Sequence, residues 1–132
     1  MGYTCFDVDI ADKIAHLRLN RPREYNSMTR AFCGELPAVL REIDAAASAR
    51  VVVISSSGKH FSSGMDLAVF GGQGFTTPGT SETGRMREML RRTVLELQDT
   101  FNALEQIRMP VLTAIQGGCI GGAVDFVSAA DI

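Results

Sequence analysis

Apolar and polar residues alternate in two short stretches near the N-terminus. Val8 and Ile10 lie in the first stretch, Ile14 to Leu19 forms the second, and Ala11-Asp12-Lys13 separates them. A period of two is typical of strands that bury one face. The pattern therefore predicts a β-hairpin at the start of the chain.

Beyond the hairpin, the apolar residues recur at intervals of three and four. The positions are Phe32, Leu36, Val39, Leu40 and Ile43. This interval is typical of an amphipathic helix, and Thr29 is a suitable N-cap because its hydroxyl can accept a backbone N–H. We expect a helix from Thr29 to the Ala-rich stretch before Arg50.

Two further apolar runs are short and continuous. They are Val51-Val52-Val53-Ile54 and, after Pro110, Val111 to Ile115. Continuous runs rich in β-branched residues are typical of strands that are buried on both faces of a parallel sheet. We therefore expect two inner strands at these positions.

Two more helices are expected in the second half of the chain. The first is predicted by the helical spacing of Met86, Leu90, Val94, Leu97, Phe101 and Leu104, and its arginines are interpreted as a solvated face. The second runs from about Gly121 to Ala129. Strands that alternate with helices indicate an α/β fold with a largely parallel inner sheet.

Residues 68–84 interrupt this alternation with many glycines, serines and threonines. Such a segment can bury little apolar surface. We expect a mobile loop there.

The composition narrows the classes of protein. The chain has 132 residues, 45% hydrophobic and 21% charged, with a net charge of −2. A single globular domain fits these values, whereas the basic footprint of nucleic-acid binding is missing. The apolar runs are also far shorter than the roughly 20 residues of a membrane helix. We therefore expect neither a nucleic acid nor a membrane as partner.

The cysteines and histidines give no metal or disulfide pattern. Cys5, Cys33 and Cys119 are odd in number and widely spaced, and His16 and His60 stand apart from other ligand-type residues. A reducing, cytoplasmic location is the expectation from the cysteines. No protein-bound metal and no separate cofactor are expected.

Three familiar motifs fail on inspection. Ser57 to His60 lacks the first glycine and the final Ser/Thr of a phosphate loop. Gly117 to Gly122 does not match the dinucleotide fingerprint, and it follows a late strand. Ser62 and Ser63 lack a nucleophile elbow, which disfavours a serine hydrolase.

Two glycine-containing turns remain, each between a predicted strand and a helix. They are Phe61 to Leu67 and Gly117 to Asp125. A helix N-terminus has unpaired backbone N–H groups, so two facing turns could hold a carbonyl oxygen as it gains negative charge. Ordinary tight turns are the alternative interpretation. Asp125 favours a site, because it places a carboxylate on an otherwise apolar helix.

Two neighbouring polar features have simpler interpretations. Asp66 is suited to capping the short helix that follows it. Residues 21–28 form a polar loop whose arginines could meet phosphates, with Asn26 suited to a turn.

The motifs along the whole chain resemble the crotonase, or enoyl-CoA hydratase/isomerase, superfamily. The resemblance is carried, in order, by Leu19-Asn20-Arg21-Pro22 with Asn26-Ser27-Met28, by Gly58 to Leu67, by Gly117 to Asp125, and by Ala130-Asp131-Ile132. It implies a spiral of ββα units. It also implies that residues 1–132 are the N-terminal part of a single domain, and we expect the natural protein to continue beyond Ile132.

The resemblance also implies an acyl-CoA thioester substrate. The oxyanion donors of the family map onto the backbone N–H groups of Met65 and Gly122. The catalytic acid or base maps onto Asp125. The resemblance implies that coenzyme A, as part of the substrate, meets residues of the two turns and of the polar loop, namely Arg23, Glu24, Ser63, Gly64, Asp66, Leu67 and Gly121.

The identity of residue 125 helps to distinguish the reaction types within the family. Ordinary hydratases of the family carry glutamate at this position, whereas aspartate after Gly-Gly-Ala-Val is most similar to dienoyl-CoA isomerases, which move a 3,5-diene to the 2,4 position. Enoyl-CoA hydratase activity is the alternative within the family. A non-catalytic acyl-CoA binding or assembly subunit is the alternative from another class. The resemblance implies assembly as a homotrimer or a dimer of trimers.

Overall fold

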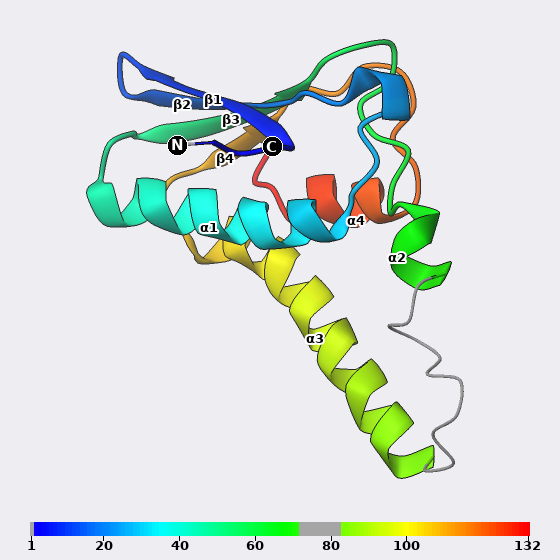
Figure 1. Cartoon of the computed structure of the whole chain (residues 1–132). Helices are drawn as coiled ribbons and strands as arrows, with labels where there is room; N and C mark the ends of the chain where they lie inside the picture. The colour runs from blue at the N-terminus through cyan, green and yellow to red at the C-terminus, as the bar shows by residue number, and fades with distance from the viewer. Residues whose placement is uncertain (1, 72–82) are drawn as a thin grey trace.

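The computed structural model describes residues 2–71 and 83–132, which form one four-stranded sheet with helices packed beneath it (Figure 1). In chain order the elements are β1 (Phe6–Ala11), β2 (Ile14–Leu19), the 3-10 helix η1 (Pro22–Glu24), α1 (Arg30–Ala46), β3 (Val51–Ser56), α2 (Leu67–Gly71), α3 (Thr83–Gln106), β4 (Val111–Thr113) and α4 (Gly122–Ser128).

The sheet has the order β1-β2-β3-β4. β1 and β2 pair antiparallel, whereas β2 with β3 and β3 with β4 pair parallel. The hairpin turns at Asp12 and Lys13, whose φ angles of 52° and 66° give the left-handed conformation that tight hairpin turns require. The predicted hairpin and the parallel pairing of the two inner strands are confirmed, but the second inner strand ends at Thr113 and not at Ile115 as predicted.

Helix α1 covers one face of the sheet (Figure 1). Its sheet-facing residues are buried, and they include all five apolar positions of the predicted pattern. The Thr29 hydroxyl accepts the N–H of Phe32 at 3.3 Å, so the expected N-cap is present. Strand β3 is fully buried on the same face at Val52 and Ile54, but its other face is only half-buried. The expectation that both faces of this strand are buried is therefore wrong for one face.

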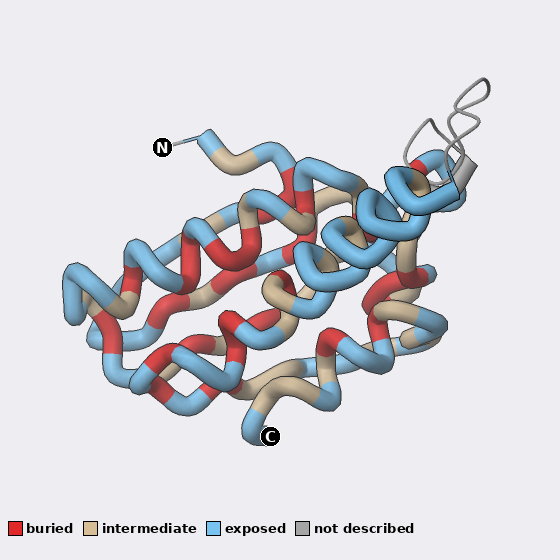
Figure 2. The backbone as a smooth tube through the Cα atoms, turned by 90° about the horizontal axis from the view of Figure 1, so that it is seen from below, coloured by how far each residue is buried: buried red, intermediate tan, exposed pale blue. Residues whose placement is uncertain are grey.

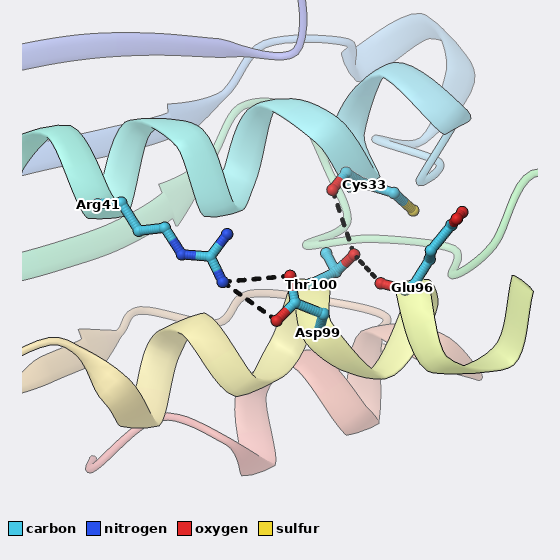
Figure 3. Close-up of polar contacts among 5 residues, drawn as sticks. All are labelled: Cys33, Arg41, Glu96, Asp99 and Thr100. Atoms are coloured by element: carbon cyan, nitrogen blue, oxygen red, sulfur yellow. Dashed lines mark hydrogen bonds and ion pairs between the residues drawn. The ribbon is translucent and has the colours of Figure 1, made fainter. Parts of the chain in front are cut away.

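Helix α3 lies farther from the sheet and projects beyond the other helices (Figures 1 and 2). Among its described side chains only Thr100, Ala103 and Leu104 are buried. Figure 3 shows the contact with α1, where Arg41 meets Asp99 at 3.1 Å and the Thr100 hydroxyl donates to the Cys33 carbonyl at 3.2 Å. Of the six apolar positions predicted for this helix, Leu104 is buried, Leu90 and Val94 are exposed, and the other three are partly buried, because the outer turns extend past the core.

The predicted loop over residues 68–84 is wrong at both ends. Residues 68–71 belong to α2, and residues 83–84 open α3. Asp66 starts α2 by accepting the Ala68 N–H at its Oδ1 atom, 2.8 Å away, as its capping interpretation predicts. The remainder of the predicted loop, residues 72–82, lies outside the described residues.

An aromatic cluster fixes α4 against the rest of the core. The Phe126 ring lies edge-on to Phe32 of α1, with centroids 5.5 Å apart, and stacks on Phe61 at 6.0 Å. Phe101 of α3 completes the cluster at 6.2 Å. Phe126 directly follows Asp125, so the packing of Phe126 fixes the rotation of α4 about its axis. This rotation in turn fixes the direction in which Asp125 leaves the helix.

The last two residues lie alongside β4. The N–H of Thr113 donates to the Ile132 carbonyl at 2.8 Å, and the N–H of Ile132 donates to the Val111 carbonyl at 3.2 Å. This pattern is that of a parallel strand pair. Residues 131–132 therefore add to the sheet, as expected for a strand that begins there.

Candidate active site

The two glycine-containing turns lie side by side and are hydrogen-bonded to each other. The N–H of Ser62 donates to the Gly118 carbonyl at 3.3 Å, and the N–H of Ile120 donates to the Ser62 carbonyl at 3.2 Å. These bonds form an isolated parallel bridge between Ser62 and Cys119. The structure thus brings together two segments that are more than fifty residues apart in the sequence.

The first turn is also fixed by a contact with Met28. The N–H of Met28 donates to the Gly64 carbonyl at 2.8 Å, and the N–H of Asp66 donates to the Met28 carbonyl at 2.9 Å. These bonds use the groups on either side of the Met65 N–H. Among the described residues, neither the N–H of Met65 nor that of Gly122 donates a hydrogen bond. Both predicted donors are therefore free to bind an acceptor.

The two donors come from backbone segments that are in close contact. A Cβ atom on Gly122 would lie 3.1 Å from Cγ of Met65. A Cβ atom on Gly64 would lie only 2.5 Å from the Ile120 carbonyl oxygen and 3.2 Å from the Gly122 nitrogen. The φ angle of Gly64 is also 92°, which an L side chain rarely adopts. Glycine at position 64 therefore permits the close approach of the two turns.

A cavity of about 740 Å³ opens beside these two donors. Of the predicted site residues, five line it: Ser63, Met65, Gly121, Gly122 and Asp125. The opposite wall is one face of α3, formed by Val94, Leu97, Gln98, Phe101, Asn102 and Glu105. The cavity thus combines an apolar wall with free N–H groups and carboxylates, which is the usual composition of a small-molecule site.

Asp125 is exposed and lies in the first turn of α4. The core side of this helix carries Ala123 and Phe126, so Asp125 faces the opposite side. Its carboxylate therefore borders the cavity without being part of the core. This position makes it accessible to a bound substrate.

The remaining predicted binding residues do not line the large cavity. Gly64 is buried between the two turns, and Asp66 caps α2 and accepts the Ser27 hydroxyl at 3.2 Å. Leu67 is 82% exposed. Arg23 and Glu24 are exposed on η1. The next residue, Tyr25, contacts the first turn, because its carbonyl accepts the N–H of Ser63 at 2.9 Å.

A second cavity of about 280 Å³ lies between η1 and the two turns. It is lined by Tyr25, His60, Ser62, Ser63, Gly118 and Ile120. Ser63 lines both cavities. The two cavities therefore adjoin at Ser63.

The sequence did not reveal several residues that support the site. The Ser62 hydroxyl donates to the Asn26 carbonyl at 2.8 Å and accepts the N–H of Gly64 at 3.1 Å. Asn26 is buried and donates from Nδ2 to the Ser57 carbonyl at 2.8 Å. These contacts join distant segments and have no local sequence signal. The cavity wall on α3, by contrast, follows the helical spacing of Val94 and Phe101.

Within the described residues, no group of three or more His, Cys, Asp or Glu side chains is placed to hold a metal ion. Cys119, in the second turn, is partly buried, and burial raises the pKa of its thiol. A raised pKa keeps the reactive thiolate scarce at neutral pH. The free N–H groups and Asp125 are thus the chemically relevant features of this cavity.

Comparison with known proteins agrees with this geometry. The family model described as enoyl-CoA hydratase/isomerase matches residues 9–132. The chain belongs to the enoyl-CoA hydratase/isomerase family. It is thus a member of a family of enzymes that act on acyl-CoA thioesters, and its α/β structure is the crotonase fold.

Individual relatives in this family include dienoyl-CoA isomerases. The chain is 40% identical to the mitochondrial Delta(3,5)-Delta(2,4)-dienoyl-CoA isomerase of Mus musculus over 132 residues, which is 99% of this chain and 40% of that protein. It is 39% identical to the peroxisomal enzyme of that name from Arabidopsis thaliana over 119 residues, 90% of this chain and 43% of that protein. The chain therefore spans about two fifths of the length of these relatives.

A solved structure of the family confirms the fold. An enoyl-CoA hydratase from Bacillus anthracis matches with a TM-score of 0.78 and 30% identity, over 97% of this chain and 46% of that one. The names of the two isomerases place those proteins in mitochondria and peroxisomes, whereas the cysteines of this chain led us to expect the cytoplasm. No described helix is both long and apolar enough to cross a membrane.

Proposed function

We propose that this family member takes part in the isomerisation of 3,5-dienoyl-CoA to 2,4-dienoyl-CoA. The observation that carries the proposal is the pair of free N–H groups, Met65 and Gly122, beside the Asp125 carboxylate in one cavity. The 40% identity to a dienoyl-CoA isomerase over 99% of the chain supports this choice within the family.

The two N–H groups form the oxyanion hole in this proposal. When a proton leaves C2 of the acyl chain, negative charge moves onto the thioester oxygen. Two donors fixed by backbone hydrogen bonds stabilise that charge without reorganising, and each such donor is worth roughly 3 to 4 kcal/mol of barrier. The Met28 contact and the bridge between Ser62 and Cys119 are what hold the donors in place.

Asp125 is the proposed acid or base. The isomerisation removes one proton from C2 and adds one at C6, so the proton count balances and no water is consumed. A carboxylate at the border of the cavity can accept or return one of these protons. Ala129, one helical turn later, lines the same cavity, so the acyl chain in this proposal runs past Asp125.

The substrate lies across both cavities in this proposal. The apolar wall of α3 receives the acyl chain, and coenzyme A passes the first turn on the side of η1. Ser63 and Gly121 line the cavity beside the thioester region, whereas Gly64 supports the first turn through hydrogen bonds within the protein. Asp66, Leu67, Arg23 and Glu24 lie farther out, where Leu67 and Arg23 are accessible to the nucleotide part of coenzyme A. Coenzyme A arrives with the substrate, and the mechanism uses no other cofactor.

Hydration of a 2-enoyl-CoA is the second candidate function. A relative from Mycobacterium leprae, named as a probable enoyl-CoA hydratase, is 35% identical over 121 residues, 91% of this chain and 39% of that protein. The same oxyanion hole would serve this reaction, because addition of water also passes through an enolate. A non-catalytic acyl-CoA binding subunit would use the cavity without either reaction.

Ultraviolet absorbance separates these functions. An isomerase produces the longer-wavelength band of a conjugated 2,4-dienoyl thioester from 3,5-dienoyl-CoA. A hydratase instead removes the absorbance of a 2-enoyl-CoA. Binding of acyl-CoA with neither change would contradict both enzymatic proposals and support the binding subunit.

For the location, we propose a reducing compartment, because the described cysteines Cys5, Cys33 and Cys119 are all free thiols. The cytoplasm remains the compartment we predict. Imaging of the tagged natural protein would test this proposal. A mitochondrial or peroxisomal signal would contradict it.

A further inference from the structure

His60 makes a contact that the proposed chemistry has not used. Its Nδ1 atom accepts the N–H of Gly118 at 2.8 Å. His60 lies two residues before the bridge residue Ser62, and Gly118 lies two residues before Ile120 on the other turn. The imidazole ring therefore joins the two turns at the start of the segments that carry Met65 and Gly122.

Both the carbonyl and the N–H group of Gly118 make hydrogen bonds. Its carbonyl accepts the N–H of Phe61 at 3.0 Å and that of Ser62 at 3.3 Å. Its N–H would have no backbone acceptor among the described residues, and the His60 ring supplies one instead. Without this acceptor, a partly buried N–H would be left unpaired, which is costly.

The ring is closely packed in this position. A Cβ atom on Gly117 would lie 2.8 Å from Nδ1 of His60, and the Tyr25 ring lies 6.0 Å away on centroids. Only the neutral ring with its proton on Nε2 can accept this hydrogen bond, because a protonated ring has N–H groups at both nitrogens.

We propose that neutral His60 is a positioning residue for the acyl-thioester site, which holds the Gly118 turn against the first turn and thereby sets the separation of the Met65 and Gly122 N–H groups. This inference rests on the proposed function of those two donors. His60 itself touches no reacting atom in this proposal. Its protonation removes the acceptor and loosens the second turn.

The proposal predicts a dependence on pH, because protonation of the ring removes the acceptor of the Gly118 N–H. Other titratable or charged groups stand on the segments that contact the ring. They are Arg23, Glu24 and Tyr25 around η1, Lys59 in the same loop, and Cys119 beside Gly118.

Three substitutions separate positioning from general packing. His60→Asn keeps an acceptor oxygen close to the position of Nδ1, at every pH. His60→Gln carries the same amide one methylene farther out, which makes it the matched control. His60→Leu removes the acceptor. Two readouts are compared at pH 7.5 and 5.5: the exchange protection of the Gly118 amide by NMR, and the affinity for acetoacetyl-CoA relative to free CoA.

At pH 7.5 the wild-type chain should show a protected Gly118 amide and should bind acetoacetyl-CoA more tightly than free CoA. At pH 5.5 the protection factor of this amide and the ratio of the two affinities should each fall about tenfold. His60→Asn should retain both at both pH values. His60→Gln and His60→Leu should resemble the acidified wild type at both pH values. The Met28 amide, which donates to the Gly64 carbonyl at 2.8 Å, should stay protected throughout and so shows that the fold is intact.

The proposal is overturned if His60→Leu keeps the wild-type values at pH 7.5, or if His60→Asn shows the pH response of the wild type. A wild-type chain that prefers acetoacetyl-CoA to CoA at neither pH would instead contradict the proposed function. The Gly118 amide would then still decide whether His60 holds the second turn.

Discussion

Gly64 lies where the two turns of the cavity come closest to each other. A side chain here meets the Ile120 carbonyl oxygen at 2.5 Å and requires a φ angle of 92°. We expect Gly64→Ala to push the second turn away and to lower acyl-CoA affinity at least tenfold, with a loss of roughly 1–3 kcal/mol of stability from the strained backbone. Gly121→Ala is the control for backbone strain in the unfolding measurement, because its φ of 61° is positive too but its Cβ meets nothing within 4 Å.

Calorimetric titration with an acyl-CoA and chemical unfolding measure both effects of Gly64→Ala. The two variants share a positive φ angle, so the difference between them reports the contact with the second turn. An acyl-CoA affinity of Gly64→Ala equal to that of the wild type would show that the spacing of the turns does not matter for binding.

Asp125 is tested by a change that preserves its size. Asp125→Asn removes the proton acceptor from the border of the cavity, and the exposed position of the side chain predicts little effect on folding. In an active enzyme we expect turnover to fall by about 10²- to 10⁴-fold with acyl-CoA affinity little changed. A steady-state assay with 3,5-dienoyl-CoA as substrate measures the turnover. Near-normal turnover of the variant would show that Asp125 is not the catalytic acid or base.

The single residues of the site could be predicted only in part. Met65, Gly122 and Asp125 were found because a motif of consecutive residues identifies them, and the structure places all three at one cavity. His60 and Asn26 were not assigned a positioning role, because their contacts join segments that only the folded chain brings together. A local pattern carries no information about such contacts.

The elements of the fold were predicted well wherever periodicity reflects burial. Helix α1 follows its predicted apolar positions because that face packs on the sheet. The same spacing correctly predicted α3, but it did not reveal which turns are buried, because a helix that lines an open cavity shows the same periodicity as one that packs in a core. Helix α2 was anticipated only through its cap, Asp66, because a helix of five residues is too short to show a period.

The attachment of the N-terminal segment to α1 depends on Glu35. Its carboxylate accepts the backbone N–H groups of Thr4 at 2.8 Å and Cys5 at 2.9 Å. Burial acts to raise the pKa of Glu35, but these hydrogen bonds and that of the Thr4 hydroxyl outweigh it, so the pKa lies below its usual value of 4.5. The charged form is therefore the one that stabilises the fold.

A lowered pKa gives stability that is present above the ordinary pKa of glutamate and is lost as the pH falls through the folded-state pKa. We expect Glu35→Gln to destabilise the chain at pH 7 by less than about 1 kcal/mol, since solvent screens a partly exposed carboxylate. The difference from the wild type should disappear near pH 3. Urea unfolding of both proteins at the two pH values measures the difference in their free energies of unfolding. A difference that is the same at both pH values would show that the charge of Glu35 does not stabilise the fold.

The whole molecule presents apolar side chains on α3 that the described residues do not cover. Met89, Leu90, Val94 and Leu95 are each 40 to 48% exposed. Figure 2 shows this helix as mostly exposed along its outer turns. Exposed apolar surface of this kind favours association, and symmetric assembly is the usual outcome.

We expect the protein to assemble as a homotrimer or a dimer of trimers. Leu95→Glu places a charge on the exposed face of α3 and should shift the mass toward monomer, whereas Arg87→Glu is a charge-change control on the same helix. Light scattering at working concentration gives the mass. Only monomer in the wild type would contradict the assembly.

The central claim is that the N–H groups of Met65 and Gly122 polarise the carbonyl of an acyl-CoA thioester. Infrared spectroscopy of an acyl-CoA labelled with ¹³C at the carbonyl carbon measures this polarisation in the bound ligand, whether or not turnover occurs. We predict a carbonyl stretch at lower frequency in the complex than in water, and loss of that shift in Gly64→Ala. A bound ligand whose carbonyl stretch equals its value in water, or lies above it, would contradict the claim.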